Sequence, residues 1–83
     1  MDQVVTFRLF ASARAAAGAD EVHVPPGPAS AVIAALASAA PAPFADVLAV
    51  SSLLADGTHV DRSATAPIPA GTVVDVLPPF AGG

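Results

Sequence analysis

The chain has 83 residues, no cysteine, three arginines, no lysine and a formal net charge of −4. This length predicts one domain with a small core, and the lack of cysteine excludes a disulfide framework, a thiolate metal site and a cysteine nucleophile. The acidic balance argues against nucleic acid and membranes as partners, since nucleic acid and anionic lipid surfaces are bound through basic surfaces. We expect a cytoplasmic protein without a signal peptide or membrane span.

The first predicted element is a strand over residues 4–10, where apolar and polar side chains alternate. Val5, Phe7 and Leu9 fall on one face, which we expect to be buried. Phe10 then falls on the polar face, where an aromatic side chain has no core to join. This strand is therefore expected to end with an exposed aromatic residue.

Two helices and a second strand are predicted next. Residues 11–17 are rich in alanine and predict a short helix that ends at Gly18. Residues 20–24 alternate again and predict a strand. After a proline-rich loop, apolar residues recur at helical spacing, with Ser30 as the candidate N-cap and Pro41 as the end of the helix.

The second half of the chain predicts mainly strands. Residues 43–46 indicate a turn or a single helical turn. Residues 47–55 predict an apolar strand that ends at Asp56-Gly57, a strong hairpin signal. Residues 58–61 are the expected returning strand. The last strand covers residues 72–77. In the loop before it, Ile68 is expected to be buried in the core.

This order of elements predicts an α+β fold with a mixed sheet wrapped over one main helix. In the last strand Asp75 indicates which face is exposed to solvent. Val74 and Val76 then point inward, and Leu77 points outward. By analogy, the first and last strands are parallel neighbours in the middle of the sheet. That arrangement is the ubiquitin-like β-grasp, and we assign it to residues 1–77.

Residues 78–83 predict an extended C-terminal tail rather than another element. Their order is Pro78, Pro79, Phe80, Ala81, Gly82 and Gly83. The two prolines fix φ and remove backbone donors, and consecutive prolines favour an extended path. Glycine has no Cβ, so its backbone fits a passage too narrow for other residues. The tail therefore suggests a C-terminus delivered into another protein's active site, with an ordinary frayed chain end as the alternative.

No internal site predicts catalysis by the chain alone. The histidines fall on solvent-facing strand positions, and the acidic residues are spread along the sequence without forming a pair. No basic side chain is placed to activate a serine or threonine. The remaining feature is a surface at the root of the tail. Phe10 and Leu77 end neighbouring strands on the wet face, rimmed by Arg8 and Asp75, which is typical of a docking patch. Isolated exposed apolar residues are the alternative interpretation.

Two motifs at the ends of the chain resemble the small subunit of molybdopterin synthase, in the ThiS-MoaD family of ubiquitin-like sulfur carriers. Near the start, Leu9-Phe10-Ala11 followed by Arg14 and Gly18 matches the pattern L-F-A-x-x-R-x-x-x-G. The ending from Gly71 to Gly83 matches G-x-x-V-x-x-x-P-P-x-x-G-G. Residues 24–66 match only in pattern. The related thiamine-pathway carriers also end in Gly-Gly but lack the early arginine motif and the double proline.

The resemblance implies a carrier rather than an enzyme in its own right. A ubiquitin-activating-type adenylyltransferase would use ATP to adenylate Gly83, and a sulfur donor protein would displace AMP to leave a thiocarboxylate. The large synthase subunit would then pass this sulfur to the pterin, building the dithiolene of the molybdenum cofactor. No cofactor or metal is expected on the chain itself.

The resemblance also implies roles along the tail. Gly82 would give clearance, Phe80 and Ala81 would line the insertion path, and the two prolines would hold the tail extended. Phe10 and Leu77 are our docking candidates, and the role of Arg14 stays open between packing, capping and partner contact. Three alternatives remain: a sulfur carrier for thiamine, cysteine or a specialised metabolite, a ubiquitin-like protein modifier, and an inert β-grasp interaction domain.

Overall fold

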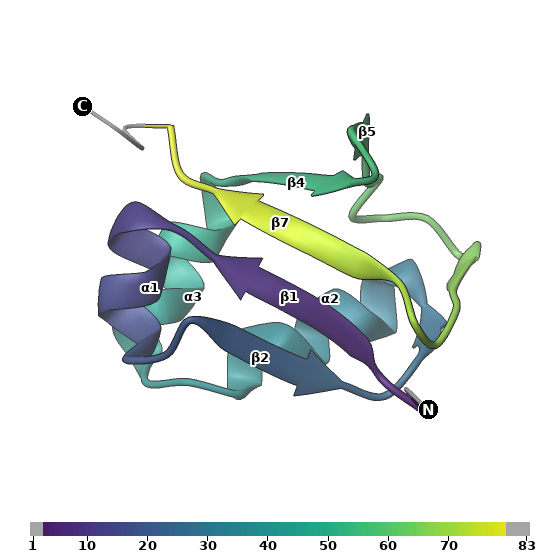
Figure 1. Ribbon diagram of the computed structural model, residues 1–83, viewed down its shortest axis with the longest axis horizontal. Coiled ribbons are helices and arrows are strands. Elements are labelled where there is room, and N and C mark those ends of the chain that lie inside the picture. The colour runs from purple at the N-terminus through teal and green to yellow at the C-terminus, as the bar shows by residue number, and fades with distance from the viewer. Residues whose placement is uncertain (1–2, 80–83) are drawn as a thin grey trace.

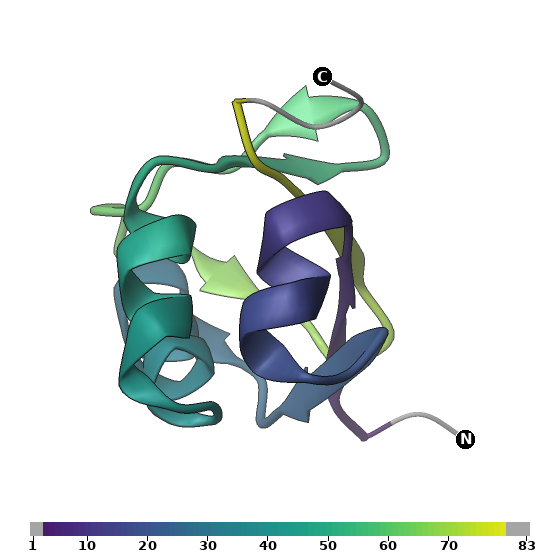
Figure 2. The same ribbon diagram turned by 90° about the vertical axis from the view of Figure 1, so that its left-hand side faces the viewer.

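A computed structural model describes residues 3–79, and its main layer is a five-stranded mixed sheet in the order β2-β1-β7-β4-β5 (Figure 1). The strands are β1 (Val5–Leu9), β2 (Glu21–Val24), β4 (Ser52–Ala55), β5 (Thr58–His59) and β7 (Val73–Leu77). Three helices, α1 (Ala11–Ala17), α2 (Ala29–Ser38) and α3 (Ala42–Ala49), lie on one face of this sheet (Figures 1 and 2). In the part of the chain that is described, no helix is both long and apolar enough to cross a membrane.

The central pair of strands is parallel, as the sequence predicts. β1 and β7 run side by side, with Phe7 opposite Val74 and Leu9 opposite Val76. β2 pairs antiparallel with β1, and β4 pairs antiparallel with β7. The predicted α+β, ubiquitin-like β-grasp fold is thereby confirmed.

The core lies between the sheet and the helices. Its buried apolar residues are Val5, Phe7, Leu9, Ala13, Val24, Ala29, Val32, Leu36, Phe44, Leu48, Leu53, Ile68, Val74 and Val76. The period-two alternation of β1 and β7 therefore turns one face of each strand inward, as predicted. Leu77 is half-buried and Val73 is exposed on the opposite face.

α3 is a full helix where the sequence predicted a turn or a single helical turn, followed by the start of a strand. Pro43 occupies the first turn of α3, where its missing N–H costs no hydrogen bond. Phe44 and Leu48 are four residues apart and both buried, which gives the helix an apolar side. The strand predicted over residues 47–55 is therefore confined to β4.

The N-cap prediction for the main helix is also wrong. Ser30 lies inside α2, and the N-cap position is Pro28, which offers no side-chain acceptor. Carbonyl groups of the loop before β6 (Pro67–Ile68) accept the first N–H groups instead: Ala29 donates to Ala66 at 3.0 Å and Ser30 to Ala64 at 3.2 Å. The C-terminal end of α2 comes at Ser38, before the predicted stop at Pro41.

The predicted glycine stop at Gly18 and the predicted Asp56-Gly57 turn are confirmed. Gly18 stops α1 in the left-handed conformation, with φ 71°, and its N–H donates to the carbonyl of Arg14 at 2.9 Å. Asp56 and Gly57 both have positive φ, 51° and 79°, which is the geometry of a type I′ turn between β4 and β5. This hairpin forms one edge of the main sheet.

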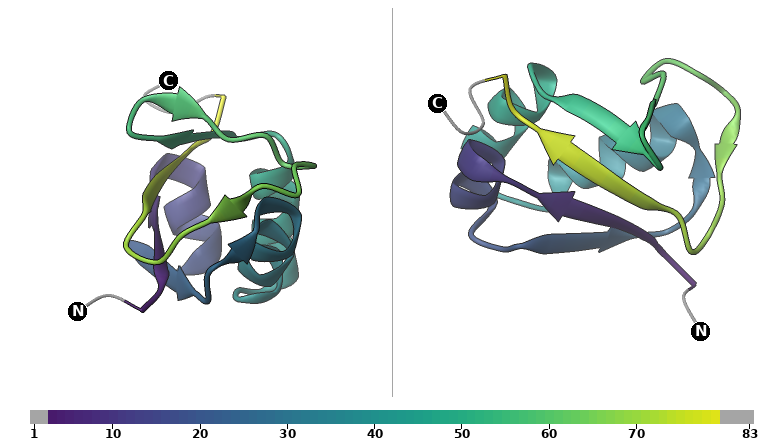
Figure 3. Two further views of the ribbon diagram at one scale, coloured as in Figure 1. Left: turned by 90° about the vertical axis from the view of Figure 1, so that its right-hand side faces the viewer. Right: turned by 45° about the horizontal axis from the view of Figure 1, so that its top comes forward.

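A second, two-stranded sheet was not predicted. β3 (Gly27–Pro28) pairs antiparallel with β6, joining the segment before α2 to the loop before β7 (Figure 3). Ile68 in β6 is buried, as predicted. Both strands contain proline, which is unusual in strands, so the pattern of apolar and polar residues does not predict them.

Candidate functional site

The candidate site is the end of the molecule from which the C-terminal segment leaves the sheet. The start of α1, the end of α3, the start of β4 and the end of β7 gather there (Figures 1 and 2). Because β1 and β7 are parallel, their carboxyl ends lie side by side, and the residues that follow them lead away at the same edge. Pro78 is buried and Pro79 is exposed, so the chain emerges from the core between these two residues.

Part of the predicted tail lies outside the described residues. Phe80, Ala81, Gly82 and Gly83 belong to that part, and their assigned roles remain predictions. Of the other tail-root residues, Leu77 is held in the sheet opposite Ser52 of β4. A buried proline after a paired strand residue fixes the position and direction of the chain where it leaves the domain.

Phe10 lies where β1 passes into α1, at the N-cap position of that helix. It is one of the exposed large apolar residues of the described chain, with 36% of its surface accessible. Arg8 places its guanidinium carbon 5.8 Å from the centre of the Phe10 ring, within cation–π range. Ala11 follows with φ 50°, a left-handed conformation that is costly for alanine and sets the direction of the helix start. The exposure expected for Phe10 is observed, while its docking role stays a prediction.

Arg8 and Asp75 form a two-pronged ion pair on the exposed face of the sheet. Nε of Arg8 donates to Oδ1 of Asp75 at 2.6 Å, and Nη2 donates to Oδ2 at 3.0 Å. The hydrogen bonds from Arg8 to Asp75 and the attraction between their charges raise the pKa of the Arg8 guanidinium above its usual value. The sequence placed both residues on the wet face, but their pairing depends on the parallel register of β1 and β7.

A shallow hollow of about 190 Å³ lies beside this ion pair. It is lined by Arg8, Leu9, Phe10, Arg14, Asp20 and Glu21. Arg14 is exposed and lies 3.9 Å from Asp20, measured from Nη1 to Oδ1. Since two arginines face two acids, the hollow presents opposite charges close together, which suits the mixed polar side chains of a protein partner better than a lone anion.

Sequence reasoning missed the corner between α3 and β4. Val50, the residue that caps α3, is 63% exposed at the same end of the molecule as Phe10. Arg62 fixes this corner: its Nη2 donates to the carbonyl of Leu48 at 2.7 Å and to the carbonyl of Ser51. No periodic pattern could identify Val50, because it belongs to neither the helix nor the strand.

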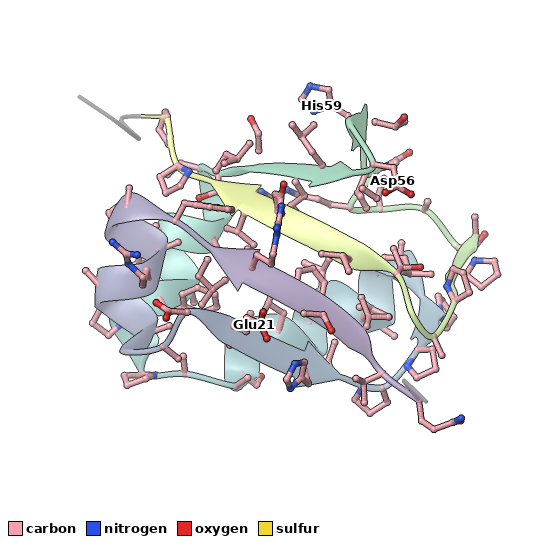
Figure 4. All side chains as sticks on the ribbon, in the orientation of Figure 1. Glu21, Asp56 and His59 are labelled. Atoms are coloured by element: carbon pink, nitrogen blue, oxygen red, sulfur yellow. The ribbon has the colours of Figure 1, made fainter. Side chains whose placement is uncertain are left out.

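The remaining titratable groups do not gather into a reactive centre within residues 3–79. His23 lies 3.4 Å from Glu21 on β2, whereas His59 projects from the β4–β5 hairpin at the other edge of the sheet (Figure 4). No cluster of three or more potential metal ligands occurs among the described residues. The arrangement is suited to presenting a chain end beside a mixed apolar and charged surface.

Comparison with known proteins supports this description. A scan against protein-family models matches the ThiS family over residues 7–83. The search of curated proteins finds no significant match. Among solved structures, the fold is similar to SAMP1 from Haloferax volcanii, with 23% identity, a TM-score of 0.77, and coverage of 96% of this chain and 99% of that one.

Two further structures from the same organism show the same likeness. The H. volcanii small archaeal modifier protein 1 has 22% identity and a TM-score of 0.74, over 93% of this chain and 98% of that chain. The solution structure of the H. volcanii HVO 2177 protein has 22% identity and a TM-score of 0.68, over 98% and 87%. At these identities the likeness establishes a shared fold.

Proposed function

Because this chain belongs to the ThiS family, we propose that it is a sulfur carrier whose C-terminal Gly83 is activated and charged with sulfur by other proteins. The observation that supports the proposal most strongly is that the family match extends through Gly83, while the described chain leaves its sheet at a buried proline, Pro78. A rigid root followed by a glycine-ended segment is what a carrier requires. The reactive groups of the transfer would belong to its partners.

The chemistry begins with a carboxylate that must be activated. A C-terminal carboxyl has a pKa of about 3.3–3.7 in model compounds, so it is ionised at neutral pH and is a poor acyl donor. A ubiquitin-activating-type adenylyltransferase would join Gly83 to AMP and release pyrophosphate from ATP. A persulfide sulfur of a donor protein would then attack the acyl carbon and expel AMP, and a thiol would cleave the resulting S–S bond, leaving the sulfur on the acyl carbon and forming a disulfide with the donor. The product is a C-terminal thiocarboxylate.

The pathway we propose is that of molybdopterin synthase, in which this chain would be the small subunit. The Leu9-Phe10-Ala11 motif with Arg14, and the double proline before the glycine-ended tail, support this pathway over that of the thiamine carriers. Inside the large subunit the sulfur would pass to the pterin that becomes the dithiolene of the molybdenum cofactor. Phe10 and Leu77 would contact that subunit at the tail root.

Protein modification is the second candidate. One of the similar structures is a small archaeal modifier protein, and a modifier would join Gly83 to an amine of a target protein. Both functions start with the same adenylation, so adenylation alone does not separate them. The lysine-free chain could not form lysine-linked chains on itself.

Reconstitution with the large synthase subunit tests the pathway. The thiocarboxylated chain and that subunit should form a stable complex that converts the pterin precursor, and removal of Gly82 and Gly83 should abolish conversion while circular dichroism shows an unchanged fold. Ser38→Ala, an exposed change at the end of α2, is the matched control and should convert normally. Amide-linked adducts of target proteins, in place of pterin conversion, would assign the chain to protein modification.

A further inference from the structure

β2 forms one free edge of the main sheet, away from the end of β7 (Figure 1). Antiparallel strands direct their backbone groups alternately toward and away from a neighbour. The N–H of Leu9 donates to the carbonyl of Asp20 at 2.8 Å, so Asp20 faces β1. By alternation, the N–H and C=O groups of Glu21 and His23 point away from β1, toward the free edge.

This edge is only four residues long and carries Glu21, but it lacks the other usual protections against strand pairing. Natural edge strands are blunted by lysine or proline, by bulges, or by a covering element. β2 contains no lysine and no proline, and it pairs with β1 in an unbroken register over its whole length. Pro25 and Pro26 follow directly after Val24, so pairing is blocked beyond the strand but open along it.

The exposed polar side chains of β2 are complementary to themselves, because the Glu21 carboxylate can accept a hydrogen bond from an imidazole N–H of His23. Glu21 and His23 lie on the same exposed face on either side of Val22, with 3.4 Å between Oε1 of Glu21 and Nε2 of His23. In an antiparallel pair of two β2 strands centred on Val22, Glu21 of each copy lies opposite His23 of the other. The same register makes these two residues a hydrogen-bonded pair, because the backbone groups of both face the edge. Backbone direction and side-chain hydrogen bonding thus favour one register.

The helix behind β2 also fits a second copy. α2 packs against β2 on the inner side of the sheet (Figure 2). It contains no charged residue, although surface helices normally carry charge on their solvent side. Its exposed positions are Ser30, Ala31, Ala34, Ala35 and Ser38. The exposed side of α2 therefore adds no bulky or charged side chain that would oppose a second copy.

From these observations we propose that two copies of the chain pair through their β2 edges to form one continuous sheet, with Glu21 of each opposite His23 of the other. The end of β7 lies away from this edge, so the point where the C-terminal segment leaves each copy stays accessible, while Glu21 is shared between the dimer contact and the hollow beside Arg8. The inference goes beyond the proposed function and does not depend on it. A short strand and an uncharged helix predict a weak, concentration-dependent dimer rather than an obligate one.

Sedimentation equilibrium from micromolar to millimolar concentration tests the dimer. The wild-type chain should pass from monomer to dimer, and the His23 amide should exchange more slowly with solvent at high concentration. His23→Pro removes an N–H that faces only the free edge, so it should abolish the dimer and leave the circular dichroism spectrum unchanged. A monomer at every concentration, or dimerisation of His23→Pro at wild-type strength, would overturn the proposal.

A charge-swap experiment tests the register. His23→Glu places carboxylates opposite each other at two positions, and Glu21→Lys replaces the carboxylate opposite His23 by an ammonium group that cannot accept its hydrogen bond; each change should weaken the homodimer roughly tenfold. Mixing the two variants restores opposite charges and should restore dimerisation between them. The matched controls, Asp46→Lys on α3 and His59→Glu on the far hairpin (Figure 4), should dimerise like the wild type. A mixture no tighter than either variant alone would contradict the proposed register.

Discussion

Arg8 and Asp75 stand opposite each other on the parallel strands β1 and β7, joined by two hydrogen bonds of 2.6 and 3.0 Å. They are 67 residues apart in sequence, yet they connect the two strands whose ends form the candidate site. The pair lies on the solvent side of the sheet, opposite the buried residues Phe7 and Val76. It therefore links the register of the central strands to the charge pattern of the proposed docking surface.

We expect the Arg8–Asp75 pair to contribute more to docking than to stability. Solvent screens exposed ion pairs, so Arg8→Ala, Asp75→Ala and the double variant should unfold at urea concentrations close to that of the wild type, with a small coupling that falls as salt rises. The same variants should slow association with the activating enzyme, because charges at an interface steer encounter. A large, salt-independent coupling in unfolding, with unchanged association, would show a structural role instead.

Phe44 should be among the residues whose truncation is most damaging. It is fully buried on α3, so Phe44→Ala should lower the free energy of unfolding by about 3–5 kcal/mol in urea titrations. Val50, at the end of the same helix, is the control: because it is 63% exposed, Val50→Ala should change stability by less than about 0.5 kcal/mol. Equal losses for the two variants would refute the assigned packing of α3.

Ala11 provides a test of backbone strain beside Phe10. With φ at 50°, alanine is strained by about 1–2 kcal/mol relative to the usual helical conformation, whereas glycine adopts this region readily. Ala11→Gly should therefore unfold at the same or a higher temperature, and Ala11→Val at a clearly lower one, since branching at Cβ disfavours positive φ. Thermal unfolding measures both. A more stable valine variant would mean that Ala11 is not left-handed.

Asp61 should contribute a pH-dependent part of the stability. The backbone N–H and the hydroxyl of Ser63 donate to its Oδ1 at 3.0 and 2.9 Å and lower the pKa of its carboxyl group. A lowered native pKa means that the stabilisation is present above the unfolded-state pKa of about 3.9 and is lost as pH falls through the lower native value. Carboxyl titration by NMR measures the shift. Ser63→Ala removes the hydroxyl donor and should move the Asp61 pKa back toward its ordinary value; no change would contradict this origin.

The elements that the sequence predicts well are those whose signal is local. The alternation through Phe7, the glycine stop at Gly18 and the Asp56-Gly57 turn each depend on nearby residues, and all are present in the structure. The Ser30 cap failed because distant carbonyl groups, those of Ala64 and Ala66, satisfy the start of α2. Pairing of that kind depends on the tertiary fold, which no single segment encodes.

The sequence predicts the apolar residues of the candidate site but not the contacts that hold the surrounding chain in place. The exposure of Phe10 and the outward-facing position of the half-buried Leu77 follow from counting along strands. The position of Val50, by contrast, depends on a guanidinium from Arg62, more than ten residues further along the chain. α3 was missed for a related reason. Its apolar residues Phe44 and Leu48 run directly into those of β4, so helix and strand merge into one apolar stretch in the sequence.

The central claim is that Gly83 carries sulfur, and the most direct test is the intact mass of the chain. After incubation with its activating enzyme, ATP and a sulfur donor, the account predicts a gain of about 16 Da, the difference between sulfur and oxygen, located at Gly83 by fragmentation, and lost when ATP is omitted. An unchanged mass under conditions in which Gly83 is demonstrably adenylated would contradict the account.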